Sequence, residues 1–153
     1  MHSSALLNLK NFFSIYLKNF NNPKILDFGS QSLSNHVGAK VLLNKMNIKY
    51  EYTGVDIEKG NNVDIVLEDP YSFKEIPNAS YDVIISTSVF EHVEFFWLTY
   101  LEILRILKPN GVFYFNVPSN GDFHRWPQDC WRFYPDSGNA LINWAKRNNF
   151  NPI

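Results

Sequence analysis

Lys24-Ile25-Leu26-Asp27-Phe28-Gly29-Ser30-Gln31-Ser32 is the stretch that decides the fold. A short apolar run reaches an aspartate and then breaks into a turn of small residues. The next segment, from Leu33 to Met46, has helical periodicity. A strand, a glycine turn and a helix in this order open the nucleotide-binding α/β domains. Because a single glycine in a turn is common, the rest of the chain has to decide what the stretch means.

The overall composition predicts one globular domain without a nucleic-acid partner. The chain has 153 residues, enough to bury a reasonable core. Its net charge of −1 lacks the positive footprint of a protein that binds nucleic acid. Cys130 is the single cysteine, which excludes an internal disulfide framework and a cysteine-based zinc site. This cysteine content agrees with a reducing, cytoplasmic location.

The N-terminal stretch predicts an amphipathic helix that leads into the domain. Apolar side chains recur there at mixed spacings of three and four residues. Lys10 and Lys18 interrupt the run, which falls short of the roughly 20 apolar residues needed to span a bilayer. We therefore expect no transmembrane segment. The chain divides into this leading helix, residues 1–20, and one domain, residues 21–153.

Five apolar segments of the domain are predicted to be strands. They are residues 25–28, 50–55, 63–66, 81–87 and 112–117. Three segments between and after them have helical periodicity: residues 33–47, 93–107 and 136–147. Strands that alternate with helices favour an α/β fold with a doubly wound, mostly parallel sheet.

The helix signals carry further detail. The second helix is predicted to present one apolar face, formed by Val93, Trp97, Tyr100, Leu104 and Leu107. Residues 108–111, with a basic residue, a proline and a glycine, are predicted to end it. Asp136 or Ser137 is predicted to cap the last helix, which runs through Arg147.

Acidic and hydroxyl side chains follow the predicted strands. In doubly wound sheets, ligands bind beyond the carboxyl ends of the strands, so these side chains are expected at one edge. They are Asp27, Asp56, Asp69, Ser86 and Thr87. Asp56 is the most informative, because its two carboxylate oxygens can accept hydrogen bonds from both hydroxyls of a ribose. The alternative is an ordinary solvated aspartate in a turn.

Five motifs in order resemble the class I S-adenosylmethionine-dependent methyltransferases, closest to their type 11 branch. They are Ile25-Leu26-Asp27-Phe28-Gly29-Ser30, Tyr52-Thr53-Gly54-Val55-Asp56-Ile57, Val63-Asp64-Ile65-Val66-Leu67-Glu68-Asp69, Tyr81-Asp82-Val83-Ile84-Ile85-Ser86 with Phe90-Glu91-His92-Val93, and Arg105-Ile106-Leu107-Lys108-Pro109-Asn110-Gly111. The resemblance implies a Rossmann-like sheet and S-adenosylmethionine as the cofactor. It covers residues 24 to about 145.

The resemblance implies that the first turn holds the methionine part of the cofactor. Asp27, Gly29 and the backbone of Ser30 and Gln31 would be the contacts there. The family turn usually has a second glycine where this chain has Gln31. A side chain at that position restricts how closely the backbone approaches a ligand. We expect a turn built differently, with Gly38 letting the following helix pack closely; the alternative is weaker cofactor binding.

The same resemblance assigns the remaining cofactor contacts. Asp56 would hold the ribose, with Ile57 beside the adenine. Asp69 would contact the adenine amino group. Ser86 and Thr87 would present backbone carbonyls to the methionine amino group.

An aromatic loop follows the fifth strand. Its core is His124-Arg125-Trp126-Pro127-Gln128-Asp129-Cys130-Trp131-Arg132-Phe133-Tyr134-Pro135-Asp136, where the prolines oppose a helix. The pattern resembles a loop in methyltransferases associated with the modification of sugars or surface polysaccharides. We predict that Trp126, Asp129 and Arg132 bind the acceptor. The alternative is a packed aromatic corner in which Asp129 and Arg132 only satisfy each other.

Two histidines are candidates for a general base. Methyl transfer is an in-line displacement, so the enzyme mainly supplies proximity and orientation. An oxygen nucleophile must also lose a proton, and histidine suits that task near neutral pH. His92 and His124 are the candidates, with neither as the alternative. His124 and Asp129 form a weak metal pair without clear further ligands, so we predict no metal site.

The sequence thus predicts S-adenosylmethionine-dependent methyl transfer to a small or carbohydrate acceptor, with O-methylation favoured. After the fifth strand only a loop and a helix remain, whereas the family sheet normally has two more strands. We therefore expect the C-terminal strands to be missing, which leaves the fifth strand as an exposed aromatic edge. The rival hypotheses are a non-catalytic S-adenosylmethionine-binding module or inactive truncated homologue, and an aromatic loop that docks a protein.

Overall fold

The computed structural model describes residues 3–32 and 38–153 of the chain. Its helices and strands, with η marking 3-10 helices, follow in chain order: α1 Ser3–Tyr16, η1 Leu17–Asn19, β1 Lys24–Phe28, α2 Ala39–Asn44, β2 Glu51–Asp56, β3 Ile65–Val66, β4 Tyr81–Thr87, η2 Phe90–His92, α3 Phe96–Ile106, β5 Leu107–Asn116 and α4 Ser137–Arg147. The predicted order of strands and helices is confirmed. In the described residues, no helix is long and apolar enough to cross a membrane.

Within the described residues, five strands form one sheet in the order β3-β2-β1-β4-β5. All four neighbouring pairs are parallel, which confirms the doubly wound α/β fold. The strand order reverses between β1 and β4, because β2 and β3 follow β1 outward on one side and β5 follows β4 on the other. The carboxyl ends of β1 and β4 therefore diverge into loops that leave a crevice between them.

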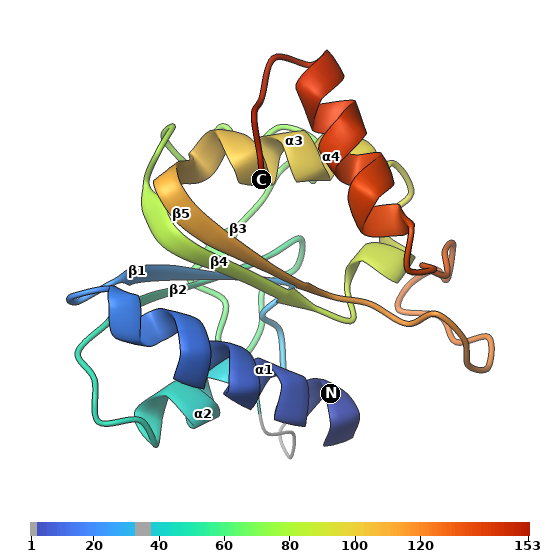
Figure 1. The fold of residues 1–153 in the computed structure, drawn as a ribbon. Coiled ribbons are helices and arrows are strands. Elements are labelled where there is room, and N and C mark those ends of the chain that lie inside the picture. The colour runs from blue at the N-terminus through green and yellow to red at the C-terminus, as the bar shows by residue number, and fades with distance from the viewer. Residues whose placement is uncertain (1–2, 33–37) are drawn as a thin grey trace.

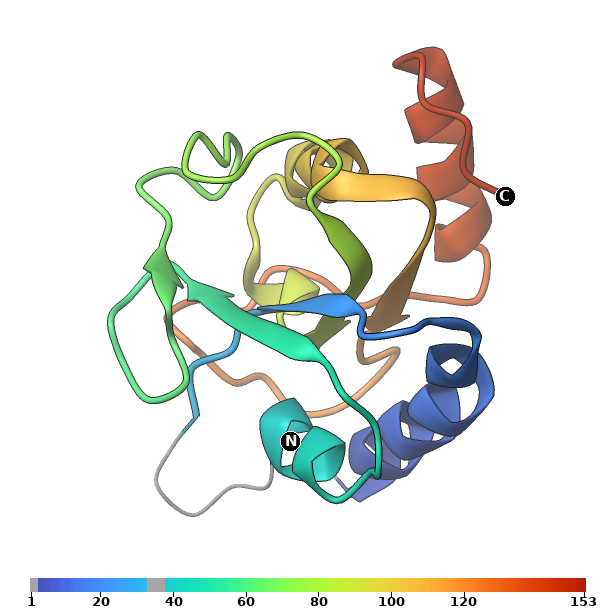
Figure 2. The ribbon, with the colours of Figure 1, turned by 90° about the vertical axis from the view of Figure 1, so that its left-hand side faces the viewer.

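Helices cover both faces of this sheet. Figures 1 and 2 show α1 and α2 on one face, with α3 and α4 on the opposite one. Successive strand residues alternate between the faces, as the pleat requires. Ile25 of β1 packs with Leu9 of α1 and Leu43 of α2, whereas Leu26 packs in the cluster that contains Ile103 of α3. The leading helix is therefore part of the core and carries one of its two apolar layers.

The helix after β4 begins later than the periodicity predicts. η2 takes up Phe90–His92, and the backbone is extended at Val93, so α3 starts only at Phe96. The fully buried face of α3 consists of Thr99, Tyr100, Ile103 and Ile106. Of the predicted apolar face, Tyr100 is buried, and Val93, Leu104 and Leu107 pack partly buried against the same core, so the face is confirmed except at Trp97.

Of two predicted helix ends, one is confirmed and one is not. α3 ends at Ile106, directly before the predicted stop at residues 108–111, and β5 already begins at Leu107, which pairs with Tyr81 before the register shifts. Asp136 precedes α4 without any side-chain capping bond, so the predicted cap is wrong. The helix predicted over 33–47 appears as α2, while residues 33–37 lie outside the described part of the chain.

Candidate active site

A cavity of about 340 Å³ opens at the carboxyl ends of the strands. It lies at the strand-order reversal, where doubly wound sheets bind ligands. Its volume is within the usual range of small-molecule sites. The turn after β1, the end of β2, the segments after β3 and β4 and the aromatic loop all contribute: Asp27, Phe28, Gly29, Ser30, Gln31, Ser32, Gly38, Ala39, Asp56, Ile57, Pro70, Tyr71, Thr87, Ser88, Val89, His92, Val93, Trp126, Pro127 and Gln128.

Gly29 makes the turn after β1 possible. Its φ is +79°, in the region that favours glycine. A Cβ there would lie 2.2 Å from Cγ2 of Val89, the residue that forms the facing wall of the cavity. The N–H groups of Gly29 and Ser30 donate to the Val55 carbonyl at 2.8 and 3.1 Å, which ties the turn to β2.

Gln31 occupies the position where the family has its second glycine. It is not among the described residues with positive φ, so its Cβ causes no strain. Its N–H donates to Asp56 Oδ2 at 2.9 Å, and its side chain packs against Gly60. The proposed compensation by Gly38 is wrong, because a Cβ there would meet no described atom within 4 Å. The turn tolerates glutamine because the side chain packs against the loop after β2, where Nε2 lies 3.5 Å from the Lys59 carbonyl.

Asp56 ends β2 at the cavity wall. Oδ2 accepts the Gln31 N–H, and Oδ1 accepts the N–H of Ile57 at 2.8 Å. These bonds fix the carboxylate orientation. Each carboxylate oxygen can accept a second hydrogen bond, so both stay able to bind a donor in the cavity.

Asp27 lies beside Asp56, at the end of β1. The Tyr52 hydroxyl donates to its Oδ2 at 2.8 Å. Removal from water raises the pKa of Asp27 from 3.8 to about 6; the Tyr52 hydrogen bond opposes this, and the charge of Asp56 adds to it. Burial and the neighbouring Asp27 likewise raise the pKa of Tyr52, so this hydroxyl stays a donor. The Asp27 carboxyl at the cavity wall therefore changes between its neutral and charged forms near pH 6.

Of the other residues predicted at the strand ends, one lines the cavity and two do not. Thr87 lines the cavity. Ser86 is buried just behind it, and its hydroxyl has no partner among the described residues. Asp69 is not part of the lining; its Oδ1 accepts the Tyr71 N–H at 2.8 Å and shapes the turn that brings Pro70 and Tyr71 to the cavity.

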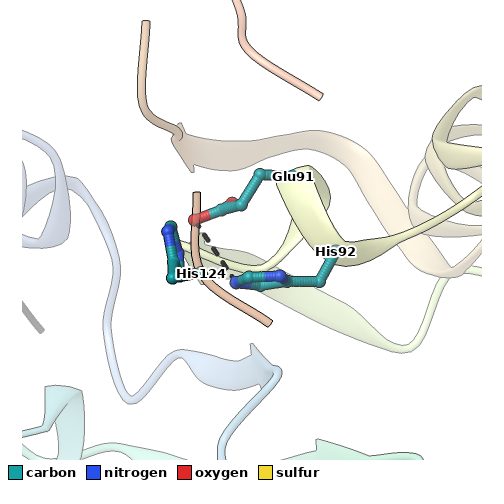
Figure 3. A group of neighbouring side chains, drawn as sticks. All are labelled: Glu91, His92 and His124. Atoms are coloured by element: carbon teal, nitrogen blue, oxygen red, sulfur yellow. Dashed lines mark ion pairs between the residues drawn. The ribbon is translucent and has the colours of Figure 1, made fainter. Parts of the chain in front are cut away.

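The two candidate bases meet at one side of the cavity. The rings of His92 and His124 lie edge to face, with centroids 5.0 Å apart (Figure 3). His92 lines the cavity, and its Nδ1 hydrogen-bonds the Gln128 carbonyl. Because a carbonyl only accepts, Nδ1 donates to it, and in the neutral imidazole Nε2 then has the free lone pair. His124 is more exposed and lies outside the lining, with Nδ1 3.0 Å from the Asp122 carbonyl.

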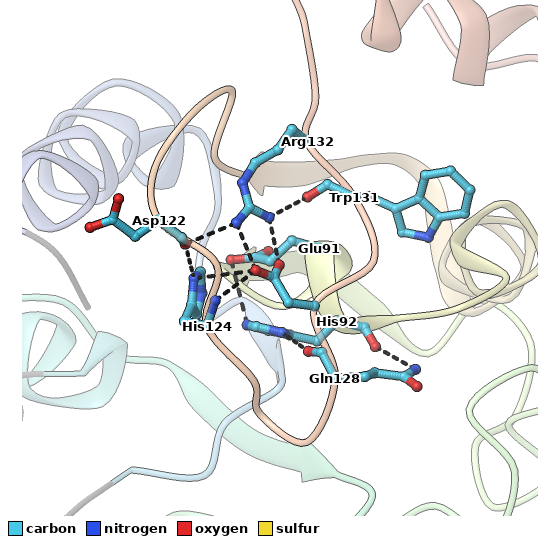
Figure 4. Close-up of polar contacts among 8 residues, drawn as sticks. Glu91, His92, Asp122, His124, Gln128, Trp131 and Arg132 are labelled. Atoms are coloured by element: carbon cyan, nitrogen blue, oxygen red, sulfur yellow. Dashed lines mark hydrogen bonds and ion pairs between the residues drawn. The ribbon is translucent and has the colours of Figure 1, made fainter.

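Asp129 and Arg132 organise the aromatic loop (Figure 4). Two hydrogen bonds of 2.5 and 2.7 Å join the guanidinium to the carboxylate. Asp129 also accepts the His124 N–H at 2.8 Å, and its side chain is 1% exposed. The Arg132 hydrogen bond and the His124 N–H hold the pKa of Asp129 well below its usual range. Neither residue lines the cavity, so this geometry agrees with the alternative of a pair that holds the loop.

The loop is fastened to η2. The N–H groups of Cys130 and Trp131 donate to the Glu91 carbonyl at 2.7 and 3.1 Å, and the Gln128 amide donates to the His92 carbonyl at 2.9 Å. Through these bonds Trp126, which is 60% exposed, reaches the cavity rim.

The sequence interpretation missed several lining residues, of which Tyr71, Val89 and Gln128 are the most prominent. Tyr71 and Val89 follow β3 and β4 by a few positions, so the rule that placed Asp69 and Thr87 would have found them if it had been extended into the loops. No local signal in the sequence distinguishes Gln128, because it is brought in by contacts with η2.

Solved structures with a similar fold share little sequence identity with this chain. The YcgJ protein of Bacillus subtilis is 18% identical with a TM-score of 0.67; the match covers 93% of this chain and 67% of that one. A SAM-dependent methyltransferase from Archaeoglobus fulgidus is 16% identical with a TM-score of 0.64, covering 90% and 67%. The methyltransferase CalH, in complex with SAH, is 18% identical with a TM-score of 0.54, covering 68% and 34%.

These likenesses confirm the fold. The chain spans from about one third to two thirds of the length of these structures. A direct comparison with curated protein sequences finds no match. The model of the family described as "Methyltransferase domain" matches residues 3–153, nearly the whole chain. The chain therefore belongs to the methyltransferase domain family, a family of enzymes whose cofactor is S-adenosylmethionine.

Proposed function

We propose that this chain binds S-adenosylmethionine in the cavity and transfers the methyl group to a small or sugar-like acceptor, with oxygen as the accepting atom. One observation carries the proposal. The carboxyl groups of Asp27 and Asp56 stand at the ends of neighbouring strands on one wall of the cavity, and His92 stands on another. A positively charged, ribose-bearing cofactor and a proton-losing acceptor suit these groups.

The residues present fit the cofactor. S-adenosylmethionine has a cationic methionine part, a ribose diol and an adenine. Asp27 offers a carboxylate to the cationic part, and Asp56 keeps acceptor capacity on both oxygens for the diol. Ile57 and Tyr71 provide apolar surface for the adenine at the same wall.

The turn has a shaping role in this proposal. The Ser30 N–H donates to the Val55 main-chain carbonyl and fixes the turn, and the Gln31 N–H donates to Asp56 and holds that carboxylate in place. The predicted contacts of Asp69 with the adenine amino group, and of the Ser86 and Thr87 carbonyls with the methionine amino group, stay predictions.

When bound, S-adenosylmethionine supplies an electrophilic methyl group. The chain has to orient the acceptor and accept its proton. His92 suits the second task, because Gln128 fixes its tautomer and Nε2 keeps a lone pair beside the cavity. His124 is the second candidate, since its ring lies against that of His92.

The acceptor side of the proposal depends on the aromatic loop. Trp126 presents a largely exposed ring at the cavity rim, which suits a small or sugar-like acceptor. The Asp129 and Arg132 pair would act by holding this loop. We place the chain in the type 11 branch on the order of its five motifs and in the sugar-associated subgroup on the pattern of the loop. We place it in the cytoplasm on its one cysteine, the free Cys130.

Calorimetry with S-adenosylhomocysteine tests cofactor binding. Replacing Asp56 by alanine should weaken binding roughly 10- to 100-fold, because hydrogen bonds to a charged group contribute about 1.5–3 kcal/mol. Glu58→Ala is the matched control, since it removes the same charge from an exposed residue two positions away. Equal affinity for Asp56→Ala and the parent would show that the ribose contact is wrong.

Methyl transfer itself needs a separate measurement. The parent is expected to label a small or carbohydrate acceptor from radioactive S-adenosylmethionine. His92→Asn, which keeps a donor toward the Gln128 carbonyl, should lower the rate by roughly 100-fold or more while cofactor affinity stays constant. Cofactor binding without transfer to any acceptor would instead support the non-catalytic binding module.

A further inference from the structure

Glu91 is a buried carboxylate without a hydrogen bond. Its relative exposure is 0%, and neither carboxylate oxygen has a partner among the described residues. Its main-chain carbonyl accepts two N–H groups from the aromatic loop, so only the side chain lacks a hydrogen-bond partner. A buried carboxylate is unfavourable unless a proton or a positive charge compensates it. Burial accordingly raises the pKa of Glu91.

Two histidines face this carboxylate. Nε2 of His92 lies 3.8 Å from Oε1 of Glu91, beyond hydrogen-bond distance. One atom each from Glu91, His92 and His124 lie within 4.8 Å of one another, and Figure 3 shows the three side chains turned toward a common centre. The residues come from two separate segments, η2 and the aromatic loop, which the loop's hydrogen bonds to Glu91 and His92 hold together.

Arg132 is a further charge near this centre, and its positive charge acts on Glu91. Its hydrogen bonds, however, go to Asp129 and to two main-chain carbonyls and none goes to Glu91. The Gln128 carbonyl holds Nδ1 of His92, which directs the Nε2 lone pair toward Glu91. Metal-binding histidines are oriented by this kind of hydrogen bond from the second ring nitrogen.

We infer that Glu91, His92 and His124 bind one divalent transition-metal ion at the wall of the cavity. Two imidazoles and a carboxylate suit zinc, manganese or iron(II) better than calcium or magnesium. Ligand atoms roughly 2.0–2.2 Å from a metal lie closer together than the present spacing, so the ligands close by about 1 Å on binding. His124, on an exposed loop, supplies that movement. The sequence analysis weighed His124 and Asp129 as a pair of metal ligands and predicted no metal site. In the structure, His124 lies instead with Glu91 and His92.

The position of the ion suggests a role in methyl transfer, and this role rests on the proposed function. His92 lines the cavity, so open coordination positions would face the acceptor. A hydroxyl bound there loses its proton more easily, because the metal stabilises the alkoxide. The histidines would then act as ligands, and the hydroxyl proton would pass to solvent water, because the metal lowers the pKa of the bound hydroxyl.

Metal binding is tested on the full chain, freed of metal by a chelator that is then removed. Titration with zinc and with manganese should give one ion per chain, and a cobalt(II) adduct should show visible bands of nitrogen and oxygen ligation. Glu91→Gln and His124→Ala should each weaken binding at least about 10- to 100-fold, the loss that even an outer-shell partner produces. Glu94→Gln, an exposed neighbour, should bind as the parent does.

Thermal unfolding guards against variants that fail to fold. Metal should raise the melting temperature of the parent and of Glu94→Gln, but not that of a folded Glu91→Gln or His124→Ala. A parent that binds no stoichiometric metal, or a Glu91→Gln variant that binds it equally well, overturns the inference. Methyl transfer that persists in a chain shown to bind no metal would overturn the use of the ion in the reaction, while leaving the proposed function standing.

Discussion

Asp27 is the residue where burial and ligand charge compete. Its pKa of about 6 means that the free protein binds a proton there in mildly acidic solution. A cationic ligand requires the carboxylate, so cofactor affinity should fall as the pH drops below 6. Between pH 7 and pH 5 the loss should reach roughly tenfold, because one proton must then be released on binding.

Calorimetry with S-adenosylmethionine from pH 5 to pH 7.5 measures this dependence. Asp27→Asn is the control, since its isosteric amide does not titrate and still hydrogen-bonds the Tyr52 hydroxyl. The variant should bind more weakly at pH 7 and show a flat profile. Parallel slopes for the parent and the variant would assign the proton to another group.

Gly29 has a backbone conformation and surroundings that do not accommodate a side chain. Gly29→Ala should lower the free energy of unfolding by about 2–4 kcal/mol, since it adds positive-φ strain and a clash with Val89. Gly138→Ala is the matched control, because a Cβ there meets no described atom within 4 Å and alanine favours helix α4. Chemical denaturation should show no loss for Gly138→Ala, or a gain of up to about 1 kcal/mol. Similar losses in both variants would contradict the assignment.

At the scale of elements, α3 locks the long connection between β3 and β4. Arg105 donates to the carbonyls of Phe73 and Ile76 at 2.9 and 3.0 Å and pairs with Glu102 at 2.8 Å. Glu102 in turn accepts the Phe73 N–H at 2.7 Å. This lock positions the start of the connection, which carries Tyr71 to the cavity.

Removing the lock should cost stability. Arg105→Ala is expected to lower the free energy of unfolding by roughly 1.5–3 kcal/mol, because it leaves two carbonyls and a carboxylate without their charged donor. Lys24→Ala, which breaks the half-exposed ion pair with Glu51, should change it by less than about 1 kcal/mol. Urea denaturation compares them. If Arg105→Ala lowers the free energy of unfolding no more than Lys24→Ala does, the connection between β3 and β4 does not depend on Arg105.

The strands and helices also show which parts of the fold could be predicted from the sequence. The strands were predictable because their apolar runs are short and end at aspartates, as in β1 and β2. The start of α3 could not be predicted, because the backbone becomes extended at Val93 and a periodic apolar pattern does not reveal such a break. The carboxyl-end rule located Asp27 and Asp56. Glu91 escaped it, since its burial depends on a loop about forty residues later.

At the scale of the whole molecule, the carboxylates divide into two classes with opposite effects of pH. Glu102 loses solvation, but the Arg105 and Phe73 hydrogen bonds outweigh this and lower its pKa. Hydrogen bonds from Arg132 and His124 lower that of Asp129. Such groups stabilise the fold above the ordinary carboxylate pKa near 4, and this contribution is lost as the pH falls further. Asp27 and Glu91 behave oppositely, since burial raises their pKa values and the folded state therefore binds their protons more tightly.

Stability should therefore be highest in mildly acidic solution. For Asp27, the difference between 3.8 and about 6 corresponds to roughly 3 kcal/mol, lost as the pH rises through this interval. The melting temperature of the ligand-free, metal-free chain should rise from pH 3 to about pH 4.5 and decline toward pH 7. Asp27→Asn should remove much of the decline. An unchanged decline in that variant would refute the account.

Trp126 gives the molecule a built-in optical signal. Its indole is 60% exposed at the cavity rim, whereas the indole N–H groups of Trp131 and Trp144 are bound to main-chain carbonyls. Occupancy of the cavity would change the solvent around Trp126 far more than around those two. The tryptophan emission of the unlabelled chain should therefore shift with ligand concentration, and Trp126→Phe should silence the shift. Candidate acceptors can then be screened by fluorescence before any turnover is measured.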